Sequence, residues 1–292
     1  MRRCLPNGIP AFFYLGGNAM FGEYLENVRK QTPLIHNITN YVTVNDVANI
    51  LLACGASPIM SDDADEVEDI VSICGGLCIN IGTLNKNTIP SMLLAGKKAN
   101  ALGHRTVLDP VGAGASKLRT ETAFQLIEEI HFDVIRGNIS EIKALALGSG
   151  GAKGVDADIA DAVTEDTLES AITFVQTFSK KTNSIIAVTG AIDILAAAEH
   201  CILIWNGRPE MGKITGTGCQ LSAMIAAYIT ANPGKILEAA AAAVCAMGLA
   251  GEIGHRKMQP EDGNSTYRNR IIDAICNLDA KTLEEGARYE IR

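Results

Sequence analysis

The chain has 292 residues, 47% of them hydrophobic, so it can bury a large core as one α/β domain. Its formal net charge of −8 excludes the basic face that nucleic acid requires. Its aromatic content of 5% leaves no base-stacking platform, so a small-molecule ligand is expected and no nucleic acid.

The N-terminal 19 residues are expected to be an extension, either disordered or the product of a start codon placed too far upstream. Pro6, Asn7 and Pro10 interrupt the apolar stretch that a signal peptide needs. From Met20 the pattern becomes helical, and no linker or charge block divides the remainder. The sequence therefore predicts a single domain over residues 20–292.

The eight cysteines include no CxxC pair and no zinc-like cluster, and most lie in apolar runs. This usage is typical of free thiols in a reducing cytoplasm. The apolar run 239–251 is too short to span a bilayer, so we expect a buried helix and no membrane partner.

Short apolar runs alternate with longer helical patterns along the chain. Strands are expected at 58–60, 77–81, 106–109, 132–136 and 184–189, followed by a hairpin of 193–198 and 201–205. After the helical segment that begins at Met20, helices are expected near 42–54, 64–74, 87–102, 119–130, 139–147, 165–181, 219–231, 234–257 and 265–277, with a surface loop at 148–154. This alternation predicts a mostly parallel sheet covered by helices on both faces, with the hairpin adding an antiparallel pair.

Polar and glycine-rich segments follow the expected strands. They are 80–83, 109–114, 136–141, 189–190 and 214–219. In sheets of this kind ligands bind beyond the carboxyl ends of the strands, so the five segments are expected to form one site.

The segment 214–219 reads Ile-Thr-Gly-Thr-Gly-Cys and precedes an apolar helical pattern. Backbone amides at such a helix start attract phosphate, so Gly216, Thr217 and Gly218 are expected to form an anion hole. A thiol at this point has its pKa lowered by the helix dipole, which makes a thiolate accessible near neutral pH. Cys219 is therefore a candidate general base or nucleophile, rather than the inert buried thiol that is usual for this residue type. No motif supplies the His partner of a nucleophilic cysteine, so base catalysis is favoured over nucleophilic attack.

Asp109 follows a strand, where a carboxylate can hold Mg²⁺ through water; the alternative is an ordinary Asp-Pro turn. Arg136 ends a strand and can clamp a phosphate. Glu141 can share the metal with Asp109 or can form a capping box with Asn138. Thr189 precedes a glycine at a strand exit, where it can contact a nucleotide phosphate, although Thr-Gly is also a common strand end.

The segment HNITNY contains His36 and Asn40, which either line a pocket or cap the following helix. A structural role is favoured for His36. No GxxxxGK[ST] motif occurs, which excludes a P-loop nucleotide site.

Seven motifs resemble those of one family and occur in that family's order: HNITNYVTVNDVAN, GASPIM, NIGTL, LDPVGAGAS, RGNISEI, VTG and ITGTGC. The resemblance is to hydroxyethylthiazole kinase, a thiamine-salvage family, and covers about residues 20–270. It implies a three-layer α-β-α ribokinase-like fold with a mostly parallel central sheet. Two departures are residues 1–19, which have no counterpart, and the acidic run Ser61-Asp62-Asp63.

The resemblance implies MgATP-dependent phosphorylation of the hydroxyl of 4-methyl-5-(2-hydroxyethyl)thiazole. It implies that Arg136 and Thr189 contact ATP and that Asp109 and Glu141 organise Mg²⁺. Met60, Gly216 and, more weakly, Asn40 would contact the thiazole, with Cys219 beside its hydroxyl. It also implies a homotrimer with sites at subunit boundaries, so that Met60 can serve a neighbour's site.

Rival functions are another ribokinase-like vitamin kinase, an ATP-dependent repair dehydratase, a cysteine hydrolase and a nucleotide-binding regulator without catalysis. Many ribokinase-like enzymes end the glycine turn in Asp, whereas this chain ends it in Cys219, as the thiazole kinases do. This difference favours the thiazole kinase.

Overall fold

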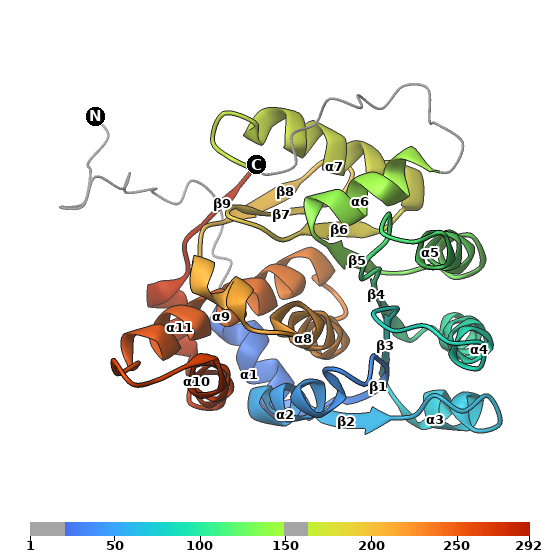
Figure 1. The fold of residues 1–292 in the computed structure, drawn as a ribbon, viewed down its shortest axis with the longest axis horizontal. Helices are drawn as coiled ribbons and strands as arrows, with labels where there is room; N and C mark the ends of the chain where they lie inside the picture. Colours follow the sequence, from blue (N-terminus) through green and yellow to red (C-terminus); the bar gives the residue numbers. More distant parts are fainter. Residues whose placement is uncertain (1–20, 149–162) are drawn as a thin grey trace.

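The structure, a computed structural model, describes residues 21–148 and 163–292. The expected N-terminal extension and residues 149–154 of the expected glycine-rich loop lie outside these ranges. Figure 1 views the central sheet nearly edge-on, with a layer of helices on either side.

The central sheet has nine strands in the order β2-β1-β3-β4-β5-β6-β7-β8-β9. Their bounds are β1 Leu34–Ile38, β2 Ser57–Met60, β3 Gly76–Asn80, β4 Arg105–Asp109, β5 Val134–Gly137, β6 Ile185–Val188, β7 Asp193–Ala196, β8 Cys201–Ile204 and β9 Tyr289–Ile291. The pairings from β2 to β6 are parallel, and those from β6 to β9 are antiparallel. The predicted mostly parallel sheet and the predicted hairpin are both confirmed.

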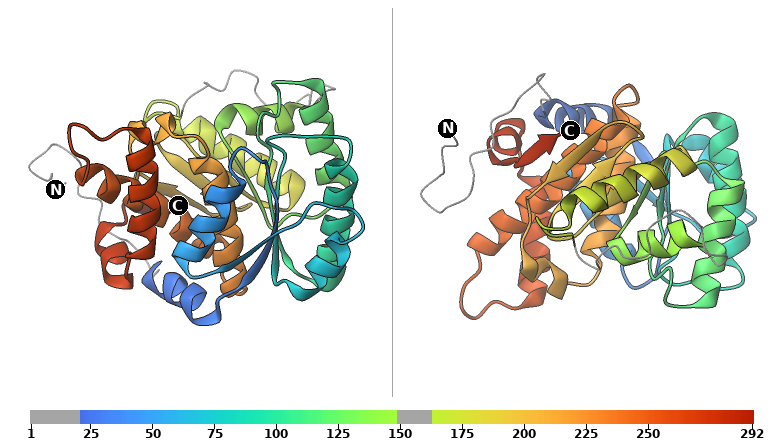
Figure 2. Two further views of the ribbon diagram at one scale, coloured as in Figure 1. Left: turned by 60° about the horizontal axis from the view of Figure 1, so that its bottom comes forward. Right: turned by 90° about the horizontal axis from the view of Figure 1, so that it is seen from above.

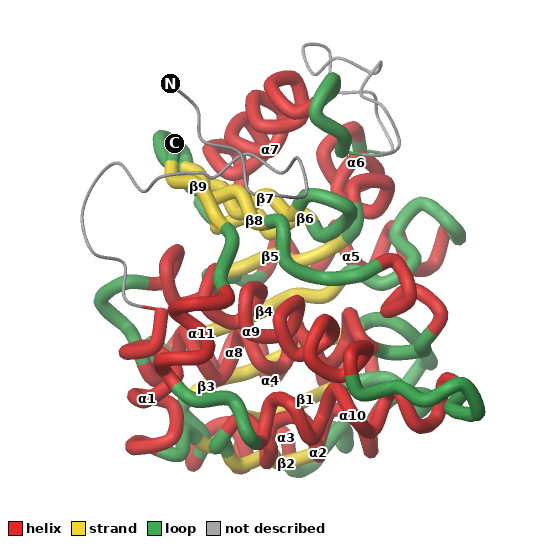
Figure 3. The backbone as a smooth tube through the Cα atoms, turned by 90° about the vertical axis from the view of Figure 1, so that its left-hand side faces the viewer, coloured by secondary structure: helices red, strands yellow, loops and turns green. Residues whose placement is uncertain are grey.

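The helices form the two outer layers, on either side of the sheet in Figure 2. One layer contains α1 Phe21–Gln31, α2 Val44–Cys54, α8 Thr217–Ala231, α9 Ile236–Arg256, α10 Asn264–Cys276 and α11 Ala280–Gly286; the other contains α3 Val67–Ile73, α4 Thr88–Leu102, α5 Lys117–Glu129, α6 Ile139–Leu147 and α7 Leu168–Thr182. Figure 3 shows the first layer in front of the strands. The α-β-α architecture predicted from the sequence is therefore confirmed.

Side chains that alternate along each strand build the two cores. Cys78, Val107 and Val134 belong to the core under α8 and α9, whereas Leu77 and Leu108 belong to the opposite core. Because successive strand residues point to opposite faces, a strand with helices on both sides must be apolar throughout. This explains why the inner parts of the strands, such as 77–79, 107–108 and 185–188, are apolar in the sequence.

Helix α9 is long and apolar enough to cross a membrane by composition, but 72% of its 18-residue apolar window is buried inside the protein. Its alanines let it pack closely against α8 and α10. This burial confirms the expected buried helix. A core helix of this kind has the same composition as a membrane span, so composition alone does not separate the two.

Four elements were not expected from the sequence: β1, α11, β9 and the 3₁₀ helix Pro209–Lys213. Strand β1 is interrupted by two polar residues, His36 and Asn37, which hide its apolar run. His36 is nevertheless fully buried, because its Nε2 hydrogen-bonds Ser61 O at 2.8 Å. Strand β9 depends on pairing with β8, which is distant in the sequence.

Candidate active site

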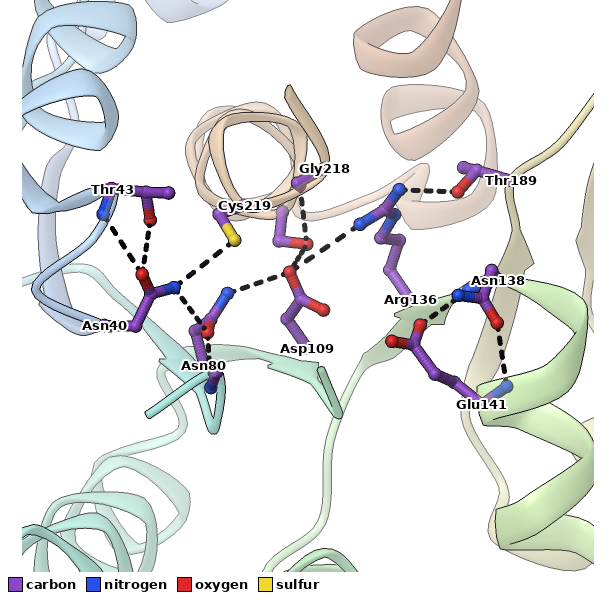
Figure 4. A network of polar contacts seen from close by, with 12 residues as sticks. Asn40, Thr43, Asn80, Asp109, Arg136, Asn138, Glu141, Thr189, Gly218 and Cys219 are labelled. Carbon is purple, nitrogen blue, oxygen red and sulfur yellow. Dashed lines mark hydrogen bonds and ion pairs between the residues drawn. The ribbon is translucent and has the colours of Figure 1, made fainter. Parts of the chain in front are cut away.

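The predicted site residues other than Met60 meet at the carboxyl edge of the sheet, where Figure 4 shows most of them. Asn80 and Asp109 end β3 and β4, Arg136 lies near the end of β5, and Thr189 follows β6. The N-terminus of α8 lies over them. The strand exits therefore converge at one edge, as expected, and their forming one ligand site stays a prediction.

Asp109 is fully buried at the centre of this edge. Its Oδ2 accepts hydrogen bonds from Asn80 Nδ2 at 3.0 Å and Ser222 Oγ at 2.8 Å, while its Oδ1 is buried without a hydrogen-bond partner in the described structure. Burial raises the pKa of Asp109 to about 6, against the opposing effects of Arg136 and the two hydrogen bonds. A carboxylate held by one oxygen has its other oxygen available for a cation or water.

Arg136 joins Asp109 to the end of β6. Its Nη1 lies 3.7 Å from Asp109 Oδ2, and its Nη2 donates a hydrogen bond to Thr189 Oγ1 at 2.5 Å. A Cβ at Gly218 would lie too close to the guanidinium, so a larger residue there would displace Arg136 from this position. The structure therefore places a fixed positive charge beneath the start of α8.

The glycine turn leads directly into a helix, as the sequence predicted. Gly216 has a φ of +89° and precedes α8, which begins at Thr217, two residues earlier than expected. The N–H of Gln220 bonds Gly216 O, so the amides of Thr217, Gly218 and Cys219 precede the helical ladder. Free amides at a helix start beside an arginine form a suitable anion site.

Cys219 is partly buried and accepts a hydrogen bond from Asn40 Nδ2 at 3.4 Å. Asn40 is held in turn by Thr43, whose N–H and Oγ1 both donate to Asn40 Oδ1. Burial and the nearby Asp109 raise the pKa of the Cys219 thiol, although contacts with Thr43, Asn80 and Asn40 lower it. The expected lowered thiol pKa is therefore wrong, because desolvation and a neighbouring carboxyl outweigh the favourable contacts.

Glu141 forms the capping box that the sequence left as an alternative. Its Oε2 accepts from Asn138 N at 2.9 Å, and Asn138 Oδ1 accepts from Glu141 N at 2.8 Å. Its Oε1 also accepts from Gly112 N at 2.8 Å. Glu141 thus anchors the loop after Asp109 to the start of α6, a role that capping alone does not require.

A cavity of about 490 Å³ opens beside Arg136, Thr189 and the α8 turn, and Thr217 and Gly218 line it. Apolar side chains from α8 and α9, including Leu221, Val244 and Met247, line its deeper wall. Its volume and mixed lining suit a ligand with a charged end and a flat apolar end.

Met60 does not line that cavity. It lines a separate cavity of about 200 Å³ with Asn37, Thr39 and Tyr41, next to the edge strand β2. Tyr41 and Val42, which follow Asn40, are 77% and 59% exposed. Within one chain, Met60 and the α8 turn therefore line different cavities.

A sequence model of the hydroxyethylthiazole kinase family matches residues 25–281. The chain belongs to this family. It is 64% identical over 271 residues to a hydroxyethylthiazole kinase of Clostridium acetobutylicum, covering 93% of this chain and 99% of the relative.

Solved structures agree with the assignment to the family. A hydroxyethylthiazole kinase from Pyrococcus horikoshii superposes with a TM-score of 0.83 at 32% identity, covering 93% of this chain and 98% of that structure. A pyridoxal kinase from Staphylococcus aureus superposes with a TM-score of 0.58 at 14% identity, covering 89% and 97%. The second likeness shows the shared ribokinase-like fold alone.

Three polar residues at this edge of the sheet were not assigned a role from the sequence. Asn80 bridges Asn40 and Asp109, with its Oδ1 accepting from Asn40 Nδ2 at 3.0 Å. Ser222 lies one turn after Cys219, and Asp193 begins β7 in the wall of the 490 Å³ cavity. Asn80 and Asp193 are each the one polar side chain of an apolar strand, and that isolation is the signal available in the sequence; Ser222 shares α8 with Thr217, Gln220 and Thr230 and has no such signal.

Proposed function

We propose that the chain transfers the γ-phosphoryl group of ATP to the hydroxyl of 4-methyl-5-(2-hydroxyethyl)thiazole. The observation that carries this proposal is the convergence of Asp109, Arg136 and the 216–219 turn at one sheet edge, in a chain 64% identical to a named hydroxyethylthiazole kinase. Phosphoryl transfer depends mainly on positioning and charge stabilisation, which these groups supply.

ATP is proposed to occupy the 490 Å³ cavity with its base among the apolar side chains of α8 and α9. Its phosphates would then reach Arg136, Thr189 and the amides of the α8 turn. Those amides face the position where charge develops on the transferring group, as the donors of an oxyanion hole do. The guanidinium, already paired with Thr189, needs little rearrangement to bind a phosphate oxygen.

Asp109 and Glu141 are proposed to hold Mg²⁺, in part through water. Among the described residues no group of three or more His, Cys, Asp or Glu side chains is placed to hold a metal. Magnesium fits such a sparse set, since it keeps several waters and takes few carboxylates, and the unpartnered Asp109 Oδ1 is the oxygen best placed to serve it. When bound, the ion neutralises charge on the phosphates and orients them.

Cys219 and Asn40 are proposed to flank the substrate hydroxyl, with Gly216 against the thiazole. A thiol with a raised pKa is mainly protonated at neutral pH, which makes it a poor general base. We therefore assign Cys219 the orientation of the hydroxyl. The chain's homologous kinases and this protonated thiol both argue against a cysteine hydrolase.

A homotrimer with sites at subunit boundaries is proposed to complete the thiazole site. The exposed Tyr41 and Val42 adjoin Asn40, and Met60 lines a cavity of its own, so a neighbouring chain can bring its Met60 to this site. Light scattering after size exclusion should give three times the 30.9 kDa chain mass, and a monomer that is fully active would refute this arrangement. The free thiols of the described cysteines support a reducing, cytoplasmic location.

ADP release from MgATP tests the function directly. We expect release to depend on added hydroxyethylthiazole and to yield its phosphate in equal amount. Pyridoxal serves as the competing acceptor, because a pyridoxal kinase shares the fold. ADP release that thiazole does not stimulate, or that pyridoxal stimulates more strongly, would refute the proposal.

A further inference from the structure

Asp193 is a buried carboxyl group in the wall of the 490 Å³ cavity with no part in the reaction proposed above. It is the first residue of β7 and is 8% exposed. The same cavity is lined by Arg136, Thr189 and Gly190. Because β7 runs antiparallel to β6, its first residue lies at the sheet edge where β6 ends.

The carboxylate of Asp193 fixes the turn between these two strands. Its Oδ1 accepts a hydrogen bond from Gly190 N at 2.9 Å. Gly190 directly follows Thr189, whose N–H donates to Gly137 O at 3.0 Å and whose Oγ1 accepts from Arg136. The turn is therefore held by Asp193 on one side and β5 on the other, with the Arg136 guanidinium attached to it.

Charge links the same residues. Burial raises the pKa of Asp193 to about 7, whereas the Gly190 N–H and the Arg136 guanidinium favour its ionised form. Asp109 also interacts with Arg136, so two buried carboxyl groups influence one guanidinium. The contacts of Arg136 with Thr189 and Asp109 restrain the guanidinium before a ligand arrives, which lowers the entropy cost of binding.

We propose that Asp193 is a positioning residue for nucleotide binding: it holds the Thr189–Gly190 turn and, through Thr189, directs Arg136 at the phosphates. This inference rests on the proposed function, because it takes the cavity as the nucleotide site. The competing explanation is that Asp193 only closes the β6–β7 hairpin, in which case its loss would lower stability alone.

Two variants separate these explanations. Asp193→Ala removes the acceptor for Gly190 N–H, whereas Asp193→Asn keeps an oxygen that can accept the same bond. We expect Asp193→Ala to weaken ADP binding and to raise the KM for ATP about tenfold, with the KM for thiazole changed less than about twofold. Asp193→Asn is expected to remain within about threefold of the unmodified protein in both ADP binding and KM for ATP.

Asp133→Ala is the matched control. Asp133 precedes β5 at the opposite end of the sheet, where it accepts from Thr106 N and Arg105 Nη1, each at 2.8 Å. Its loss should lower the melting temperature and leave ADP binding unchanged. A positioning role is supported only if Asp193→Ala weakens ADP binding by more than any Asp133→Ala effect.

Three results would overturn the inference. They are unchanged ADP binding in Asp193→Ala, equal rises in both KM values, and an Asp193→Asn variant as weak as Asp193→Ala. Direct titration with ADP separates failure of the positioning role from failure of the proposed function. If the unmodified protein binds no ADP, both fail; if it binds ADP and Asp193→Ala binds equally well, only the positioning role fails.

Discussion

Replacing Arg136 by alanine should weaken ATP binding selectively. A hydrogen bond that involves a charged group contributes about 1.5–3 kcal/mol, so losing one phosphate contact should raise the KM for ATP roughly 10- to 150-fold. Arg136 lines the proposed nucleotide cavity, whereas Met60 lines the separate cavity of about 200 Å³. The KM for thiazole should therefore change less than about threefold.

The same substitution should cost less stability than a broken buried ion pair usually does. Removing one partner of such a pair typically costs about 3–5 kcal/mol, because a buried charge is left alone. Asp109, however, has a pKa of about 6 with Arg136 present. Protonating Asp109 at pH 7 costs roughly 1.4 kcal/mol and removes the uncompensated charge, so the part of the stability loss that comes from Asp109 cannot exceed this value.

This limit has a specific pH dependence. Protonation costs more at higher pH, so the loss through Asp109 should grow by roughly 1.4 kcal/mol per pH unit from pH 6 to 8. Urea unfolding of the unmodified protein and Arg136→Ala at pH 6, 7 and 8, without nucleotide or Mg²⁺, measures this loss of stability. Arg105→Ala is the control, because Arg105 pairs with Asp133 at 2.8 Å at the opposite sheet edge and should leave the KM for ATP unchanged.

Two results would refute the reasoning. If Arg136→Ala raised the KM for ATP and for thiazole equally, Arg136 would not belong to the nucleotide side. If the loss of stability were the same at pH 6 and pH 8, Asp109 would not be the group left uncompensated.

Three further predictions concern single residues. Cys219→Asp should retain activity, because a carboxylate at this position can accept the hydroxyl proton. Cys219→Ala should lose roughly three- to tenfold in kcat, the share expected of orientation; a 1000-fold loss in Cys219→Ala would restore the base role. Glu141→Ala should lower stability by about 1–2 kcal/mol through the lost cap, and it should raise the Mg²⁺ concentration needed for half-maximal rate. Glu141→Gln should keep most of the stability. An unchanged Mg²⁺ requirement in both variants would remove Glu141 from the metal site. The raised pKa of Asp193 means that its contribution to stability is present below pH 3.8 and is lost as the pH rises to about 7. Across that window Asp193→Asn should therefore gain stability over the unmodified protein, by at most roughly 4 kcal/mol, as measured by thermal unfolding. A gain that appears only on acidification would show the sign to be wrong.

Local chemistry made much of the fold predictable. Strand β6 is an uninterrupted apolar run, and β3 and β4 are apolar at 77–79 and 107–108, because these strands are covered on both faces. Strand β1 was missed because His36 and Asn37 interrupt its apolar pattern. The burial of His36 depends on the hydrogen bond between its Nε2 and Ser61 O, a contact that the chain makes only after folding. Strand β9 was missed because three residues acquire their structure from β8, far away in the sequence.

The sequence by itself determined where the site is and which residue types form it. Parallel strands bring their carboxyl ends to one edge, so Asp109, Arg136, Thr189 and the 216–219 turn had to converge there. Tertiary structure alone decided the state of these groups, because a pKa depends on burial and on neighbours from other elements. It raised the pKa of Cys219, which a helix start alone would lower, and it brought Asp193 into the wall of the 490 Å³ cavity.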